Sequence, residues 1–176
     1  EANRPKITEI VFEDGTEQVT CFAVWSNFTY LKKVTIPRSV KSIPAGMFKG
    51  SKNPTIVLED EHYTFLAWYD NSMFYGESVA PVNYAGETGW LYPKWEGNPH
   101  VVTIERNIEE AGTVSGGGTY PYGTTATLTV TNDSRYDFLG WYEGDTLLSK
   151  NEWYSFFVSG DRTIIAKWEV HPFTVT

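Results

Sequence analysis

The sequence predicts a mainly β protein that combines two kinds of repeated unit. Three observations carry this prediction: short β-branched runs recur at regular spacing in the first third, an aromatic motif occurs twice, and apolar and polar residues alternate with a period of two in the last third. No segment of useful length shows the helical period. We therefore expect a short repeat solenoid segment followed by small antiparallel sheet modules.

The N-terminal repeat is marked by three β-branched runs, I-V-F at 10–12, V-T-I at 34–36 and I-V-L at 56–58. They are displaced by 24 residues (34 − 10) and then by 22 (56 − 34). A leucine-rich-repeat coil takes about 20–29 residues and contributes one strand per coil. We assign residues 1–60 to such a segment.

The aromatic motif F-L-A-W-Y-D at Phe65–Asp70 returns as F-L-G-W-Y-E at Phe138–Glu143, a displacement of 73 residues (138 − 65). K-W-E at Lys94–Glu96 returns at Lys167–Glu169 with the same displacement (167 − 94 = 73). Two motifs in one register predict two copies of one unit. The copies and the beginning of a truncated third are placed at 61–97, 98–170 and 171–176. Because the first copy is short, it can take its missing strands from residues 1–60 and form one folding unit with them.

The second copy is predicted to consist mostly of strands. In 124–131 alanine, leucine and valine alternate with threonine, and 153–158 and 163–168 alternate in the same way. The nearest candidate for a helix is 71–82 in the first copy, where we expect about two turns. The tryptophans of the repeated motifs recur in register and are predicted to fill the cores: Trp68, Trp95, Trp141 and Trp168.

These residues carry a family resemblance. Y-D-F-L-G-W-Y-E at 136–143 and S-G-D-R-T-I-I-A-K-W-E at 159–169 resemble the internalin B-repeat, also called the Listeria–Bacteroides repeat, and G-T-V-S-G-G-G-T-Y-P-Y-G-T-T-A-T-L-T-V at 112–130 resembles its divergent branch. The first copy is similar, with Ala67 in place of the usual glycine. L-K-K-V-T-I-P-R-S-V-K-S-I-P-A-G-M-F-K-G at 31–50 resembles the leucine-rich repeats of BspA-like surface proteins. The resemblance implies β-grasp-like modules in a secreted or wall-attached bacterial protein.

Composition and motifs argue against several functions. A net charge of −8 opposes binding to nucleic acid, which depends on lysine and arginine, and no apolar run is long enough for insertion into a membrane. The glycines at 116–118 lack the Lys-Ser or Lys-Thr of a phosphate-binding loop and are interpreted as a hairpin or bulge. The acidic run 59–62 lacks the spacing of a calcium loop and is interpreted as a solvated linker. We expect no enzyme activity, no cofactor and no metal site.

Aromatic residues outside the repeated motifs are the candidates for ligand contact. Tyr120 and Tyr122 flank Pro121, and Trp153 lies opposite the predicted core face of its strand. Flat rings of this kind stack on sugars or peptides, although packing along an edge strand remains the alternative. The sequence thus predicts a monomeric, extracellular bacterial surface module that adheres to a host or matrix protein. A carbohydrate-binding module and a passive spacer are the alternatives.

Overall fold

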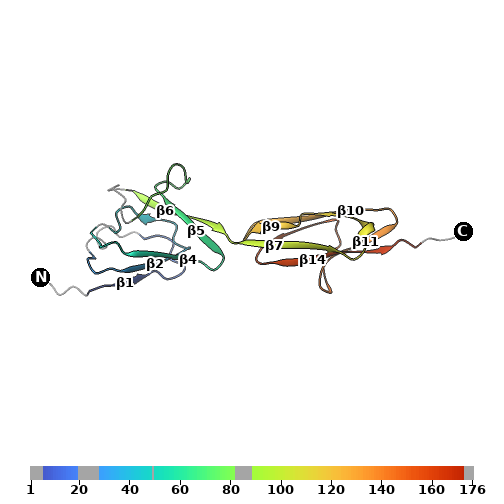
Figure 1. Ribbon diagram of the computed structural model, residues 1–176, viewed down its shortest axis with the longest axis horizontal. Helices are drawn as coiled ribbons and strands as arrows, with labels where there is room; N and C mark the ends of the chain where they lie inside the picture. The colour runs from blue at the N-terminus through green and yellow to red at the C-terminus, as the bar shows by residue number, and fades with distance from the viewer. Residues whose placement is uncertain (1–5, 20–27, 49, 82–88, 173–176) are drawn as a thin grey trace. The chain divides into compact units, whose positions relative to one another are not determined.

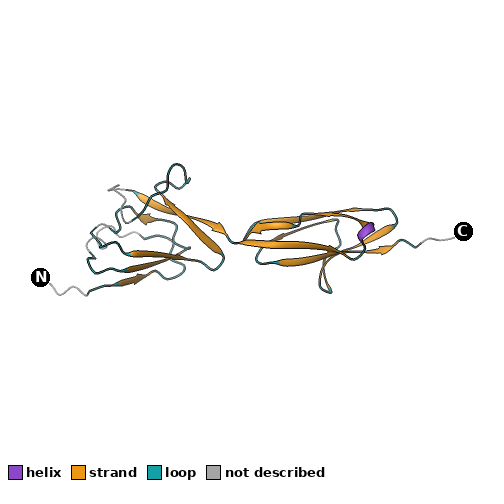
Figure 2. Cartoon of the chain, in the orientation of Figure 1, coloured by secondary structure: helices purple, strands orange, loops and turns teal. Residues whose placement is uncertain are grey.

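The computed structural model describes residues 6–19, 28–48, 50–81 and 89–172 (Figure 1). Two compact units divide the chain, residues 1–96 and 97–176. Throughout the described ranges the regular structure is strand, apart from one 3₁₀ turn at Glu109–Ala111 (Figure 2). The prediction of a mainly β protein is therefore confirmed. Most of the expected third repeat, at 173–176, lies outside the described residues.

Unit 1 contains a parallel sheet formed by the three β-branched runs. Its strands β1 (Glu9–Val11), β2 (Lys33–Pro37) and β4 (Thr55–Glu59) lie in the order β1-β2-β4. Val34 pairs with Ile10 on one side and with Ile56 on the other, so the strands stack with the displacements of 24 and 22 residues found in the sequence. The spacing of the runs thus corresponds to their pairing in space.

A second sheet of unit 1 has the order β3-β6-β5, with β3 at Ile43–Pro44, β6 at Trp90–Gly97 and β5 at Tyr63–Tyr69. β3 and β6 are antiparallel. One core joins residues of both sheets, because the buried side chains from either side of residue 60 form a single cluster. Its larger members include Val34, Ile36, Ile43, Met47, Phe48, Trp68 and Leu91.

The segment expected to form a helix at 71–82 does not do so. Its described residues form turns that lead into a bridge, where the Val79 amide donates a 2.8 Å hydrogen bond to the Trp68 carbonyl. The Asn71 side chain donates to the Tyr75 carbonyl at 2.8 Å and accepts from the Tyr75 amide at 3.0 Å. An asparagine that bonds nearby backbone groups in this way competes with helix formation, so the prediction was wrong.

Unit 2 consists of two sheets with its core between them (Figure 1). The larger sheet has the order β12-β11-β14-β7-β9, and its central pair, β14 and β7, is parallel while its other pairs are antiparallel. Its strands are β7 (Pro99–Arg106), β9 (Gly118–Pro121), β11 (Tyr136–Glu143), β12 (Thr146–Ser149) and β14 (Arg162–Val170). The expectation of an antiparallel module therefore fails at this central pair.

The smaller sheet of unit 2 is antiparallel and has the order β13-β10-β8. Its strands are β8 (Gly112–Ser115), β10 (Thr125–Asn132) and β13 (Trp153–Phe157). Ala126 and Leu128 of β10 are fully buried, whereas the threonines between them are exposed. The predicted alternation on this strand is confirmed.

An aromatic cluster forms the centre of unit 2. The Phe138 ring lies between two indoles, with its centroid 5.7 Å from that of Trp141 and 5.3 Å from that of Trp168. Both tryptophans are buried, and the Trp168 Nε1–H donates a 2.8 Å hydrogen bond to Asn132 Oδ1. Burial of one such ring contributes about 4–6 kcal/mol as an upper estimate.

The same aromatic cluster is present in unit 1. The Phe65 centroid lies 5.8 Å from that of Trp68 and 5.6 Å from that of Trp95. Trp68 is buried, while Trp95 is only half-buried. The predicted core role is thus confirmed for Trp68 and for both tryptophans of unit 2, and it holds in part for Trp95.

Gly140 allows the close contact between β11 and its neighbours. Its φ is +136°, and the pairing of β11 with β14 shifts register between Phe138 and Gly140, which marks a β-bulge. A Cβ atom at Gly140 would lie 2.5 Å from the Ser149 carbonyl oxygen. Only glycine fits this position without a shift of the backbone.

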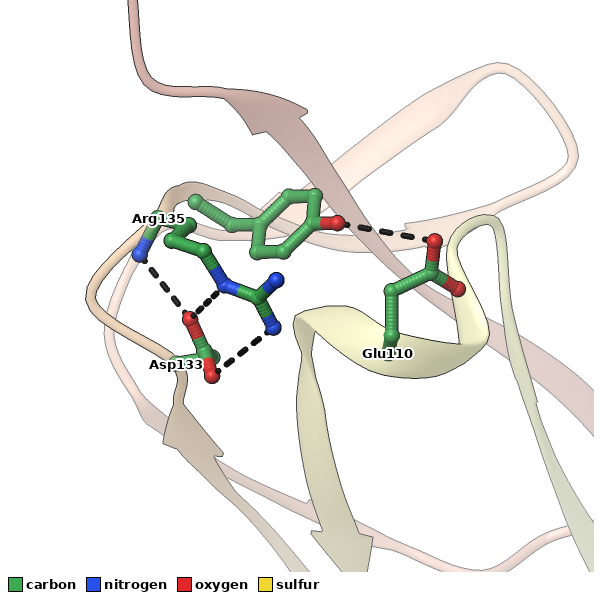
Figure 3. A network of polar contacts seen from close by, with 4 residues as sticks. Glu110, Asp133 and Arg135 are labelled. Atoms are coloured by element: carbon green, nitrogen blue, oxygen red, sulfur yellow. Dashed lines mark hydrogen bonds and ion pairs between the residues drawn. The ribbon is translucent and has the colours of Figure 1, made fainter.

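Carboxylates on the surface of unit 2 are held by arginine and by backbone amides. Hydrogen bonds from Arg135, 2.9 Å from Asp133 Oδ1, lower the pKa of Asp133 (Figure 3). Arg162 donates to Glu143 at 2.9 and 2.8 Å and lowers the pKa of that carboxyl. The pKa of Asp161 is lowered first by the Val101 amide. All three groups favour the ionised form in the folded state.

We predict that Trp141→Ala and Trp168→Ala each reduce the free energy of unfolding of unit 2 by about 3–5 kcal/mol, because each removes a buried ring and leaves a cavity. Trp153→Ala is the matched control. Its ring is 60% exposed, so its effect should stay within about 0.5 kcal/mol. Urea unfolding followed by near-ultraviolet circular dichroism measures the three variants. Unfolding curves that coincide with the parent curve for the two buried tryptophans would contradict the core assignment.

Gly140→Ala should destabilise unit 2 by about 2–3 kcal/mol, since it combines a left-handed backbone with a clash against the Ser149 carbonyl. Gly160→Ala is the control, because a Cβ there meets nothing within 4 Å and φ is not in the left-handed region. Thermal melting of both variants tests the difference. Equal melting temperatures would show that the bulge tolerates a side chain.

Unit 2 should lose stability in acid. The folded pKa values of Asp133, Glu143 and Asp161 are lowered from ordinary values of 3.8, 4.5 and 3.8, so the folded state binds fewer protons than the unfolded chain. This stabilisation is complete above about pH 5 and is lost as pH falls through the folded values. Melting temperatures measured between about pH 7 and 2 should show the decline. Glu143→Gln should flatten it, and an unchanged slope would contradict the assignment.

Candidate functional site

The three aromatic candidates have different surroundings in unit 2. Tyr120 on β9 is half-buried against the core, and its hydroxyl donates a 2.8 Å hydrogen bond to the Gly116 carbonyl. Tyr122 follows β9, and its ring centroid lies 6.0 Å from that of His100. Trp153 begins β13 and is 60% exposed. Their role in ligand contact stays a prediction, and Trp153 offers the most accessible ring.

These candidates do not gather at one place. Trp153 pairs with Thr129, whereas the far end of β13 lies at the turn that follows Tyr122, because the Gly123 amide donates to the Val158 carbonyl at 2.7 Å. Four strand residues span about 13 Å. Trp153 is therefore separated from the two tyrosines by the length of its strand.

Phe157 is an exposed ring of unit 2 that the sequence did not lead us to select as a candidate. It is 75% exposed, lies on β13 four residues after Trp153, and pairs with Thr125. A signal was present, because the alternation placed Phe157 on the same side as Trp153, opposite Tyr154 and Phe156.

Together these strands form a continuous outer surface, which we call the Thr–aromatic face. Cross-strand partners place its members on one side of the β13-β10-β8 sheet, and every member is exposed. None is charged, although the whole chain carries −8. The face consists of Thr113 and Ser115 on β8, Thr125, Thr127, Thr129 and Thr131 on β10, and Trp153, Ser155 and Phe157 on β13.

Hydroxyl groups join the strands across this face. Ser115 Oγ lies 2.7 Å from Thr129 Oγ1, and Thr127 Oγ1 lies 2.8 Å from Ser155 Oγ. Each hydroxyl has one donor and two acceptor positions, so these bonds do not exhaust its capacity. Two rings about 13 Å apart border the hydroxyl rows along β13. The face can therefore stack on a partner and form neutral hydrogen bonds with it.

The charged groups whose pKa is shifted lie outside the Thr–aromatic face. Asp133, Glu143 and Asp161 are bound by Arg135, Arg162 and the Val101 amide, as described above. Across residues 6–19, 28–48, 50–81 and 89–172, no three His, Cys, Asp or Glu side chains come together to hold a metal ion. The same ranges contain no helix that is long and apolar enough to span a membrane. The acidic run 59–62 is not a linker between units, because Glu59 ends β4 and residues 60–62 form the short connection to β5 within unit 1.

Comparison with known proteins places this geometry in context. Residues 102–172 match the family model of the divergent InlB B-repeat domain, which confirms the resemblance found for the second copy. A relative from Evansella cellulosilytica, provisionally named a Gly-rich membrane protein, is 28% identical over 170 residues, covering 94% of this chain and 19% of the relative. A second protein of that organism, provisionally named a membrane protein, is 24% identical over 172 residues, with coverages of 93% and 24%.

The chain therefore spans only about a fifth to a quarter of the length of the curated relatives it matches. No solved structure matches it. The family model matches residues 102–172, whereas the two relatives align with nearly the whole chain. The stretch 102–172 that matches the model of the divergent InlB B-repeat domain includes every strand of the Thr–aromatic face.

Proposed function

We propose that the chain is a non-enzymatic, extracellular module of a bacterial surface protein and that it adheres to a partner protein through the Thr–aromatic face. The match to a B-repeat and the names of the two relatives support a surface-associated module. The observation that carries the proposal is the pair of exposed rings on β13, Trp153 at 60% and Phe157 at 75%. Exposed aromatic residues in an uncharged surround are typical of contact surfaces.

Protein partners are favoured because β13 is an edge strand of its sheet. An edge strand presents backbone donors and acceptors to which an extended segment of another chain can add. Trp153 and Phe157 would then flank the added strand and supply most of the apolar contact, since a few aromatic residues dominate binding at such interfaces. A host or matrix protein with an exposed strand or extended segment fits this surface.

A neutral glycan is the second candidate, supported by the hydroxyl rows beside the two rings. Sugars offer apolar ring faces that stack on aromatic side chains and hydroxyls that bond to Ser115, Thr127 and their neighbours. Tyr122, near the Phe157 end of β13, would extend such a site. A passive spacer that positions other domains is the third candidate, and it requires no ligand.

We also propose a finer architecture for the two units. Residues 1–60 form a BspA-like leucine-rich-repeat segment, supported by the parallel, in-register strands β1, β2 and β4. Unit 2 is a β-grasp-like fold without its helix, supported by the central parallel pair of the first and last strands, β7 and β14, with β9 and β11 outside them. Strand β10 takes the position in the chain where a helix would cross the sheet. The unit at 61–97 is the other B-repeat copy, packed with 1–60 in one core.

The double variant Trp153→Ala/Phe157→Ala should lose binding to any captured partner by about tenfold or more, because it removes both exposed rings. Binding of the 176-residue chain is measured on an array of matrix proteins and on a glycan array. Tyr75→Ala, which removes a 72% exposed ring from unit 1, is the control and should bind like the parent.

The melting temperature of the double variant should match the parent, because both rings are exposed. Partner binding on the protein array alone supports strand addition, and binding on the glycan array alone supports the second candidate. Full retention of binding by the double variant would remove the Thr–aromatic face from consideration. Absence of binding by the parent on both arrays would favour the spacer.

A further inference from the structure

Unit 1 contains a small cavity that lies outside the Thr–aromatic face and that the proposed function does not use. Its volume is about 260 Å³. Buried Val40 and Pro93 contribute apolar surface to its wall. The other lining residues are aromatic or cationic: Arg38, Lys41, Tyr63, Phe74 and Trp95. Three rings and two cations thus line one partly open hollow in a chain of net charge −8, with Lys41 exposed and Arg38 half-buried.

The two cations of this cavity have no carboxylate partner among the residues that the structure describes. Elsewhere in unit 1 a lysine of the parallel sheet is paired, with Lys33 Nζ 3.1 Å from Glu9 Oε1. Arg38 instead places its guanidinium carbon 3.5 Å from the centroid of the Tyr63 ring. A guanidinium stacked on a ring keeps its N–H groups in its own plane, where they can bind a carboxylate with two hydrogen bonds.

The indole of Trp95 adds a donor without an acceptor. Its Nε1 is buried and has no hydrogen-bond partner within the described structure. Trp168 occupies the same position of the repeat, since 95 + 73 = 168, and its Nε1 donates to Asn132 at 2.8 Å. A buried indole N–H without an acceptor does not by itself mark a site, because the Nε1–H of Trp141 is also buried without a hydrogen-bond partner in the described structure. Trp95 differs in that its ring lines a cavity that contains two cations.

We propose that this cavity binds a carboxylate carried on a six-membered ring. The carboxylate would accept two hydrogen bonds from the Arg38 guanidinium and be attracted by the Lys41 ammonium group. The ring of the ligand would pack against the aromatic side chains that line the cavity. After a small rotation of the indole, an oxygen of the ligand would supply the acceptor that Trp95 lacks. Pockets for larger ligands measure about 300–1,000 Å³, so a cavity of this size accommodates one ring and not an oligomer.

Two sources share this chemistry, namely an acidic sugar such as a hexuronate and an aromatic acid. The cavity and the Thr–aromatic face contain no common residue. The proposal therefore does not depend on the proposed function, and either one can fail while the other holds.

Nuclear magnetic resonance of the ¹⁵N-labelled 176-residue chain tests the cavity directly. Each of its seven tryptophans gives one indole N–H signal, and Trp95→Phe identifies the signal of Trp95. Titration with sodium glucuronate or sodium benzoate should move this signal saturably, whereas methyl glucoside and acetate should not. A response to glucuronate alone assigns an acidic sugar, and a response to benzoate alone assigns an aromatic acid.

Arg38→Gln should weaken the binding of the responding acid by about tenfold or more, because it removes a charge-assisted pair of hydrogen bonds. Lys33→Gln, which changes a lysine outside the cavity, should leave binding unchanged. If Arg38→Gln does not fold, Lys41→Gln provides the same comparison with a smaller expected loss. The proposal is overturned if neither acid moves the Trp95 signal, if acetate or methyl glucoside moves it equally, or if the cavity variants bind like the parent.

Discussion

Each unit is built around its own phenylalanine ring, which lies between the indole rings of two tryptophans. In each unit the phenylalanine and the first tryptophan lie on one strand, β5 or β11, and the second tryptophan lies on a neighbour in the same sheet, β6 or β14. The rings that meet across adjacent strands have centroids 5.6 Å apart in unit 1 and 5.3 Å apart in unit 2. These contacts fix the register of those strands, because a slip of one residue would turn every ring to the other face. The remaining strands are built around this contact.

Different elements pack over the aromatic cluster in the two units. This difference determines which surfaces of each unit remain accessible to a ligand. In unit 2 Asn132, the last residue of β10, accepts a hydrogen bond from the indole N–H of Trp168. The inner side of β10 therefore packs in the core. The outer side of β10 carries only threonines and becomes part of the Thr–aromatic face. In unit 1 the residues before position 60 complete the core, and Trp95 is left half-buried beside a cavity.

Local patterns in the sequence predicted what is local in the structure. Alternation with a period of two identified β10 and β14, and repeat spacing identified the strands that stack in parallel in unit 1. Pairing between distant segments has no such signature, and this is why the parallel pairing of β7 with β14 was not foreseen. The helix expected at 71–82 failed because Asn71 bonds the backbone of Tyr75. The cavity could not be predicted from the sequence either, because Arg38 and Trp95 are distant in the chain and come together only in the folded unit.

In unit 2 the repeat distinguishes the residues of the aromatic cluster from the exposed ring of Trp153. Positions that recur with the 73-residue displacement, such as Phe65 and Phe138, are explained by the aromatic cluster. Trp153 has Ala80 as its counterpart (153 − 73), so its ring is not required by the unit that both copies share. Its exposure on an edge strand has no benefit for stability, because a large apolar ring in water contributes little burial. Trp153, on which the proposed contact surface depends, therefore lies outside the aromatic cluster that both copies share.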